Sequence, residues 1–216
     1  MIARSPGTCL PIPPVEGGRH GALASSIIRK GCWRGPSRHP VGRGGKIVKP
    51  IVIEIQGWVP APIETVFDVF MPIDLTTIMT GHGPLPGVAA VEDQSGAWNS
   101  IGESRIIRFA DGHAMLETLT RVDRPKGFAY TLSNLTNILR FLVRRFHGSW
   151  AFEDGSASGE PPIIRATWRY EFEIRSRLTR PISWLILELF WRRYMEEALE
   201  RASEQAVAVA TESEAS

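Results

Sequence analysis

Alternating apolar and polar residues predict β-strands along most of the chain after residue 50. In residues 51–56 three isoleucines alternate with Val, Glu and Gln, as in a strand that buries one face. The longest alternation, residues 163–175, sets apolar and aromatic side chains against mostly charged ones. The other predicted strands are residues 88–94, 101–109, 113–123, 127–134 and 146–152. This pattern predicts an antiparallel sheet of about seven strands with one buried face.

Apolar residues at three- and four-residue steps predict helices on both sides of these strands. Residues 63–70 form one short helix, Pro72 ends it, and a second short helix reaches Met79. A long helix is predicted from about Pro181 to Ala206, and residues 207–216 are expected to fray because they lack the pattern. Its apolar stripe consists of Trp184, Leu187, Trp191, Met195, Ala198 and Ala202. The apolar face of a curved sheet needs a cover, so the chain is predicted to be an α+β protein with this helix packed across the sheet.

The dipeptide Asp111-Gly112 joins two of the predicted strands. It favours a two-residue type I′ turn, which fixes the pairing of the strands on either side. In that pairing Arg105 and Glu117 lie on opposite faces, so only one of them points inward. An inward Glu117 would have a raised pKa and could act as an acid or a base. The alternative is a solvated charge on the outer face, and the sequence leaves the choice open.

The first 46 residues differ in composition from the rest of the chain. They hold eight Lys and Arg against one acid, a charge of +7, whereas the remaining 170 residues hold 17 Lys and Arg against 22 acids, a charge of −5. They also contain nine Gly and six Pro, with almost no apolar periodicity. This composition predicts a disordered tail at residues 1–46, before a domain at residues 47–206. The alternatives that stay open are a transit peptide, an arm that contacts nucleic-acid phosphates non-specifically, and translated upstream sequence before a start near Val48.

Several function classes find no support in the sequence. The two cysteines, Cys9 and Cys32, lie in the tail at separations from His20 and His39 that match no compact metal site. Phosphate-loop, dinucleotide, serine-hydrolase and zinc-protease signatures do not occur, so neither a metal nor another cofactor is implied. The longest apolar run, residues 182–191, is shorter than the roughly 20 residues of a membrane span. With no secretory signal, we expect a cytoplasmic protein with no specific nucleic-acid partner.

A set of short segments carries a resemblance to a known family. They are Val59-Pro-Ala-Pro-Ile-Glu-Thr-Val-Phe-Asp-Val-Phe, Gly83-Pro-Leu-Pro-Gly-Val, Gly102 with Arg105, Asp111-Gly112, Glu117, Ser149-Trp-Ala-Phe, Ala166-Thr-Trp-Arg-Tyr-Glu-Phe and Tyr194-Met195. With these segments and its order of elements, the chain resembles the helix-grip fold of the START/Bet v 1-like superfamily (SRPBCC), and most closely its polyketide cyclase/dehydrase-like branch. The resemblance covers about residues 51–202 and implies a deep cavity between the sheet and the long helix.

The resemblance implies a choice between two functions, because the family includes hydrophobic-ligand carriers and enzymes without one shared catalytic motif. The first is binding or transport of a small hydrophobic molecule, such as a lipid or a polyketide-like or aromatic metabolite. Large aromatic side chains mix apolar walls with an occasional polar group, although plain core packing is the alternative for each of them. The residues expected near the cavity are Phe67, Tyr130, Trp150, Trp168, Tyr170, Trp184 and Trp191.

The second function is an enzyme of the same fold, a cyclase or dehydratase. Its candidate acid, base or anion-stabilising groups are Glu117, Arg105 and His82, the last in a Gly/Pro segment where a cavity mouth could lie. For His82 an exposed loop position is the alternative. Two ionisable groups within hydrogen-bond reach of each other would favour the enzyme, and an apolar pocket with one or two polar groups would favour the carrier. A homodimer stays open.

Overall fold

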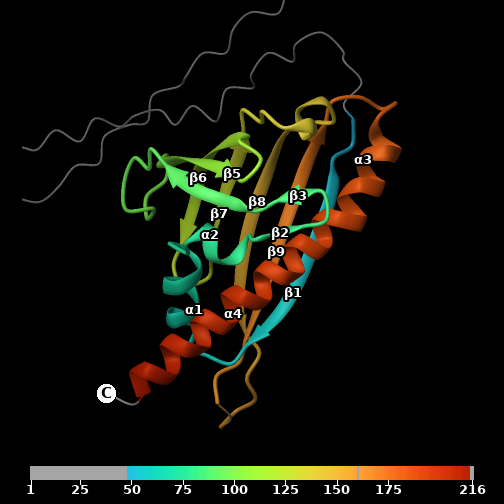
Figure 1. Ribbon diagram of the computed structural model, residues 1–216. Helices are drawn as coiled ribbons and strands as arrows, with labels where there is room; N and C mark the ends of the chain where they lie inside the picture. Colours follow the sequence, from blue (N-terminus) through green and yellow to red (C-terminus); the bar gives the residue numbers. More distant parts are fainter. Residues whose placement is uncertain (1–47, 160, 215–216) are drawn as a thin grey trace, which may run out of the picture. The chain divides into compact units, whose positions relative to one another are not determined.

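The computed structural model describes residues 48–159 and 161–214, so the predicted tail lies outside the described residues. Strands and short helices come first, and one long run of helix closes the chain (Figure 1). In chain order the elements are β1 (Ile51–Val59), α1 (Ile63–Phe70), α2 (Leu75–Ile78), β2 (Gly81–His82), β3 (Leu85–Pro86), β4 (Val88–Glu92), β5 (Ser104–Phe109), β6 (Ala114–Asp123), β7 (Gly127–Ser133), η1 (Ile138–Phe141), β8 (Val143–Asp154), β9 (Ile164–Ile174), α3 (Arg180–Ile186), η2 (Leu187–Trp191) and α4 (Arg192–Glu214).

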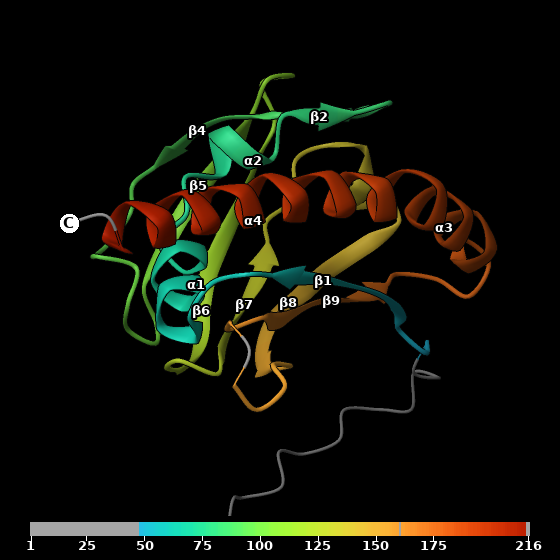
Figure 2. The same ribbon diagram turned by 90° about the horizontal axis from the view of Figure 1, so that it is seen from below.

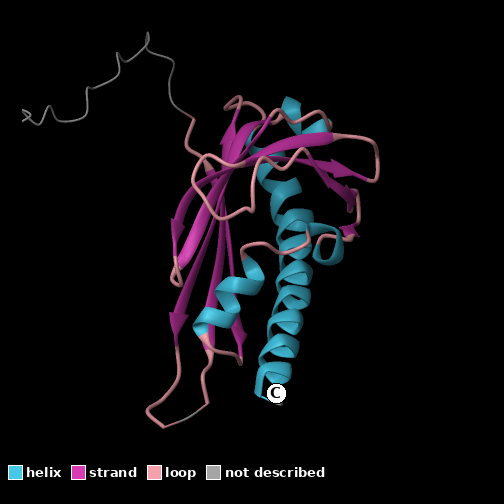
Figure 3. Cartoon of the chain, turned by 90° about the vertical axis from the view of Figure 1, so that its left-hand side faces the viewer, coloured by secondary structure: helices cyan, strands magenta, loops and turns pink. Residues whose placement is uncertain are grey.

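Seven strands form one antiparallel sheet in the order β1-β9-β8-β7-β6-β5-β4, which confirms the predicted fold. Strand β1 joins the sheet beside the last strand, β9, and the buried residues alternate along both strands as the sequence pattern required. Helix α4 crosses one face of the sheet, with α1 and α2 beside it (Figure 2). The same face is seen edge-on in Figure 3, where the strands curve along one side of the helix. The two-residue strands β2 and β3 pair separately.

The turn between β5 and β6 corrects the predicted pairing. The strands pair Arg108 with Ala114, and the amide of Phe109 donates to the carbonyl of His113 at 2.8 Å. The loop therefore has three residues rather than two, with Gly112 at a φ of +81°. A third loop residue moves one strand by one position relative to a two-residue turn. As a result Arg105 pairs directly with Glu117, and both side chains point inward.

The long helix contains a π turn, η2, between α3 and α4. Each residue turns through a smaller angle in a π turn than in an α turn, so the buried stripe shifts by one residue before η2. Ser183 is therefore buried, and Trp184 is 50% exposed instead of lying in the predicted stripe. At the other end the helix continues to Glu214, and not to about Ala206 as predicted, because Ala206 and Ala210 continue the buried stripe. Alanine favours a helix without contributing a strong apolar signal.

Candidate functional site

A cavity lies between the buried face of the sheet, α1, α2 and the end of η2. Of the twenty residues that line it, thirteen have purely apolar side chains and only Arg105 and Glu117 are charged. Five aromatic residues with a polar atom complete the wall. The cavity has about 560 Å³ of atom-free space including its opening, but only about 40 Å³ of it admits the centre of a water molecule. The cavity is therefore narrow, with room for about three waters.

Arg105 and Glu117 form an ion pair in the cavity wall. Neighbouring positions on β5 and β6 bring Arg105 Nε to 2.6 Å from Glu117 Oε2, and the two side chains are only 5% and 4% exposed. The guanidinium also lies over the ring of Trp98, 4.0 Å from its centroid. Burial raises the pKa of the Glu117 carboxyl, and the charge and hydrogen bond of Arg105 oppose that rise. The cavity thus contains a carboxyl group whose protonated form is favoured by burial.

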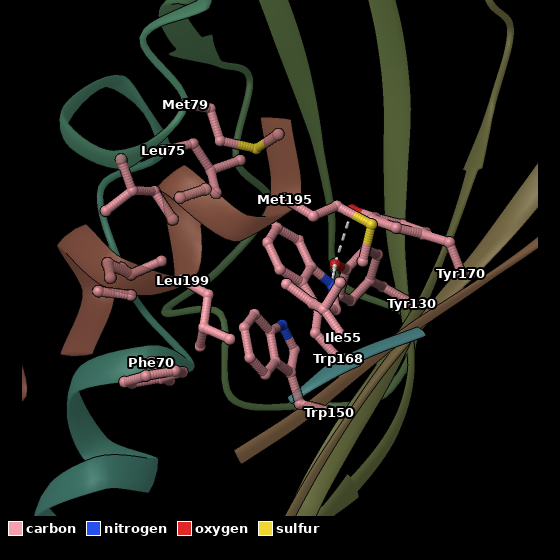
Figure 4. Packing of buried hydrophobic residues seen from close by; sticks show 14 of the residues in the cluster. Ile55, Phe70, Leu75, Met79, Tyr130, Trp150, Trp168, Tyr170, Met195 and Leu199 are labelled. Carbon is pink, nitrogen blue, oxygen red and sulfur yellow. Dashed lines mark hydrogen bonds between the residues drawn. The ribbon is translucent and has the colours of Figure 1, made fainter. Parts of the chain in front are cut away.

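Three aromatic side chains form a second polar group in the wall. The indole Nε1 of Trp168 donates to the hydroxyl of Tyr130 at 2.9 Å, and that hydroxyl is 2.9 Å from the hydroxyl of Tyr170 (Figure 4). All three side chains are buried. Burial, and then the negative charge of Glu117, raise the pKa of Tyr130, so its hydroxyl stays protonated at neutral pH. Gly148 faces Tyr130 across the strands and leaves room for its ring.

The cavity brings together seven of the ten residues that the sequence singled out. They are Arg105, Glu117, Tyr130, Trp150, Trp168, Tyr170 and Trp191. Phe67 is buried but lies behind this wall, where its ring meets those of Phe128 and Phe152 edge-on. Trp184 lies half-exposed on α3.

His82 lies outside the cavity. Its Nδ1 is 2.8 Å from Glu197 Oε1 on the partly exposed side of α4.

The sequence interpretation missed several lining residues. Three methionines line the cavity, Met71, Met79 and Met115. Met71 follows α1 directly and Met79 follows α2. The sequence pattern predicts helix ends there and gives no sign that these side chains are buried. Only Met115 carried a usable signal, since it shares one face of a predicted strand with Glu117 and the apolar Leu119. Met is unbranched and adapts to the shape of its neighbours, so these side chains can rearrange around a guest molecule.

Two other kinds of site receive no support from the described part of the chain. Within residues 48–159 and 161–214, no three His, Cys, Asp or Glu side chains gather closely enough to hold a metal ion. In the same residues, no helix combines the length and the hydropathy that crossing a membrane requires.

The fold and the internal cavity define a helix-grip protein, and comparison with known families agrees. A sequence model described as "Polyketide cyclase / dehydrase and lipid transport" matches residues 52–206. The chain therefore belongs to this family, within the START/Bet v 1-like superfamily. No curated protein sequence matches it significantly.

Solved structures show the same fold at low sequence identity. Ginseng major latex-like protein 151 from Panax ginseng is 13% identical, with 74% of this chain and 99% of that chain covered and a TM-score of 0.53. Norcoclaurine synthase from Thalictrum flavum, in complex with dopamine and hydroxybenzaldehyde, is 14% identical over 74% and 87% of the chains, with a TM-score of 0.51. A protein from Nitrosospira multiformis is 14% identical over 77% and 100%, with a TM-score of 0.50. Likeness at this level concerns the fold alone.

Proposed function

We propose that this protein binds a small, largely apolar molecule in the cavity between the sheet and the long helix. The observation that carries the proposal is the wall itself, in which eighteen of twenty lining residues are apolar or aromatic. Apolar pockets with a few convergent polar groups are typical of small-molecule sites. The family description, which includes lipid transport, supports the same function.

Binding requires the cavity to widen. Sites for drug-sized ligands occupy about 300–1,000 Å³, whereas this cavity admits the centre of a water molecule in only about 40 Å³. The three methionines, together with the short helices α1 and α2, form the part of the wall that can move without breaking the sheet. We therefore expect binding to shift the side chains of Met71, Met79 and Met115.

The binding function is tested with an uncharged apolar fluorophore, N-phenyl-naphthylamine, whose emission rises in an apolar environment. We expect wild type to bind it, and Ile107→Trp, which fills the cavity from β5, to bind at least about tenfold more weakly. The matched control is Ile101→Trp, because Ile101 is 67% exposed just before the same strand. Native mass spectrometry of the freshly purified protein would show a co-purified ligand. If wild type binds neither the probe nor any co-purified molecule, or if Ile107→Trp binds the probe as wild type does, the proposal is wrong.

A second candidate function is acid–base catalysis on the bound molecule, and the Arg105–Glu117 pair favours it. The two groups are ionisable, within hydrogen-bond reach and inside the cavity. A buried carboxyl with a raised pKa can take a proton from one atom of a substrate and return it to another, as a cyclisation or a dehydration requires. His82 has no part in this proposal, because it pairs with Glu197 outside the cavity.

Glu117→Gln separates catalysis from binding. The change keeps the shape of the side chain and an oxygen that can accept from Arg105, but it removes the proton transfer, so we expect turnover to fall by about 10²–10⁴-fold while the affinity of the folded variant is largely kept. Urea unfolding of the variant establishes that the assay is made on folded protein, because the change removes one charge of a buried pair. The matched control is Glu92→Gln, which alters an exposed Glu–Arg pair between β4 and β5. The assay follows conversion of the ligand that mass spectrometry identifies. Unchanged conversion removes Glu117 from the mechanism, and no conversion by wild type leaves the carrier function alone.

A further inference from the structure

The hydrogen bonds among Trp168, Tyr130 and Tyr170 leave one polar hydrogen without an acceptor. Trp168, Tyr130 and Tyr170 supply three polar hydrogens, one N–H and two O–H, but they make only two hydrogen bonds with one another. If Tyr130 donates to Tyr170, the hydrogen of Tyr170 is left over. If Tyr170 donates to Tyr130, the hydrogen of Tyr130 is left over. In both cases one buried hydroxyl hydrogen has no acceptor among the described residues.

Trp191 provides a second unused donor in the same wall. Its side chain is 4% exposed and lines the cavity, and its Nε1 is fully buried without a partner among the described residues. Its ring meets that of Tyr170 edge-on, with centroids 5.7 Å apart. Buried polar groups in folded proteins almost always have a partner, so two unused donors on neighbouring rings indicate a missing acceptor.

None of the described residues supplies this acceptor, and the electrostatics of the wall favour an uncharged one. Glu117, the one carboxyl in the wall, makes a hydrogen bond with Arg105 and none with Trp191 or the two tyrosines, and as an ion pair Arg105 and Glu117 leave the wall without a net charge. An anionic group buried here would find no cation except the one that Glu117 already balances. A neutral oxygen, in contrast, can accept from two donors at once.

We propose, on the basis of the binding function above, that the natural ligand is an apolar molecule with a neutral carbonyl or ether oxygen. That oxygen accepts hydrogen bonds from Trp191 Nε1 and from the unused tyrosine hydroxyl. Ketones, quinones, esters and aryl ethers have this chemistry, whereas hydrocarbons, amines and free carboxylates do not. An ordered water at the same place is the alternative that the experiment must separate.

The test compares two nearly isosteric probes, acetylnaphthalene and isopropylnaphthalene, which differ in having a carbonyl oxygen or a methyl group. Titration of the full chain gives the affinity ratio of ketone to hydrocarbon. We expect this ratio to fall about tenfold in Trp191→Phe, which removes the indole donor, and in the double variant Tyr130→Phe/Tyr170→Phe, which removes the unused hydrogen whichever hydroxyl holds it. Phe146→Leu is the control, since Phe146 packs against the rings of Tyr170 and Trp191 at 5.4 and 5.3 Å but donates nothing. It should weaken both probes alike.

A second measurement is made on the wild-type chain, so its outcome does not depend on how a substitution alters the packing. The chain has seven tryptophans, so protein labelled with nitrogen-15 in Trp gives at most seven indole signals. We expect the Trp191 signal, assigned by its loss in Trp191→Phe, to move downfield with the ketone and not with the hydrocarbon. If both probes bind with the same ratio in wild type and variants, and the Trp191 signal responds to both alike, the inference is wrong but the binding function stands. Binding of neither probe would overturn both.

Discussion

Removing one partner of the buried ion pair should destabilise the fold strongly. Arg105→Met keeps much of the aliphatic stem but leaves the Glu117 carboxylate in apolar surroundings, without the cation that lies 2.6 Å away in wild type. Breaking a buried pair in this way costs about 3–5 kcal/mol. Both side chains are at least 95% buried, so water cannot replace the lost partner. We therefore expect a loss of about 3–5 kcal/mol in the free energy of unfolding at pH 7.

This loss should depend on pH, because Glu117 can avoid the penalty by binding a proton. Burial raises its pKa and Arg105 opposes the rise, so removing Arg105 raises the pKa of Glu117 further. A carboxyl whose pKa is higher in the folded chain than in the unfolded chain stabilises the fold fully below the unfolded value, near 4.5. This contribution is lost as the pH rises toward the folded pKa, at about 1.4 kcal/mol per pH unit. Between pH 4.5 and 7 the variant should lose up to about 3 kcal/mol.

The assay is urea unfolding of the full chain, followed by circular dichroism at pH 4.5, 5.5 and 7. The matched control is Arg108→Met, which breaks the Arg108–Glu92 pair on the same strand, where the side chains are 43% and 40% exposed. Water can replace that partner, so the control should lose much less. Changing both Arg105→Met and Glu117→Leu should recover most of the loss, because no buried charge is left. A cost no larger than that of Arg108→Met, or the same cost at pH 4.5 and pH 7, would refute this reasoning.

Three further predictions concern the stability of the fold. Gly148→Ala should cost about 1–3 kcal/mol in urea unfolding, because the new methyl would overlap the ring of Tyr130. An unchanged stability would mean that this ring moves freely. Trp191→Ala should lower the free energy of unfolding by about 3–5 kcal/mol, whereas Trp184→Ala should lower it by about 1 kcal/mol or less. Equal losses would contradict the difference in burial that the π turn produces. Deletion of residues 1–46 should shift the midpoint of thermal unfolding by no more than a few degrees, because the later residues contain the seven-stranded sheet and its covering helix. A larger shift would show that the tail stabilises the domain.

Much of the fold could be predicted because it depends on local periodicity. The alternation in residues 51–56 and 163–175 indicated two strands with one buried face, and the helical stripe around Met195 indicated the helix that covers it. Each pattern reflects which side of one element is buried, and a single element is enough to reveal that. The aromatic members of the cavity wall, such as Trp150 and Trp168, were found for the same reason.

Tertiary structure decided the features that depend on the relation between elements. A three-residue turn after Phe109, in place of the predicted two, shifted one strand by one position and placed Arg105 against Glu117. A π turn before Arg192 moved Trp184 out of the buried stripe. Neither shift changes the composition or the period of the segments beside it, so the sequence pattern is the same with or without it. The register between β5 and β6 determines that Arg105 meets Glu117 in the cavity. The π turn determines which face of α3 is buried.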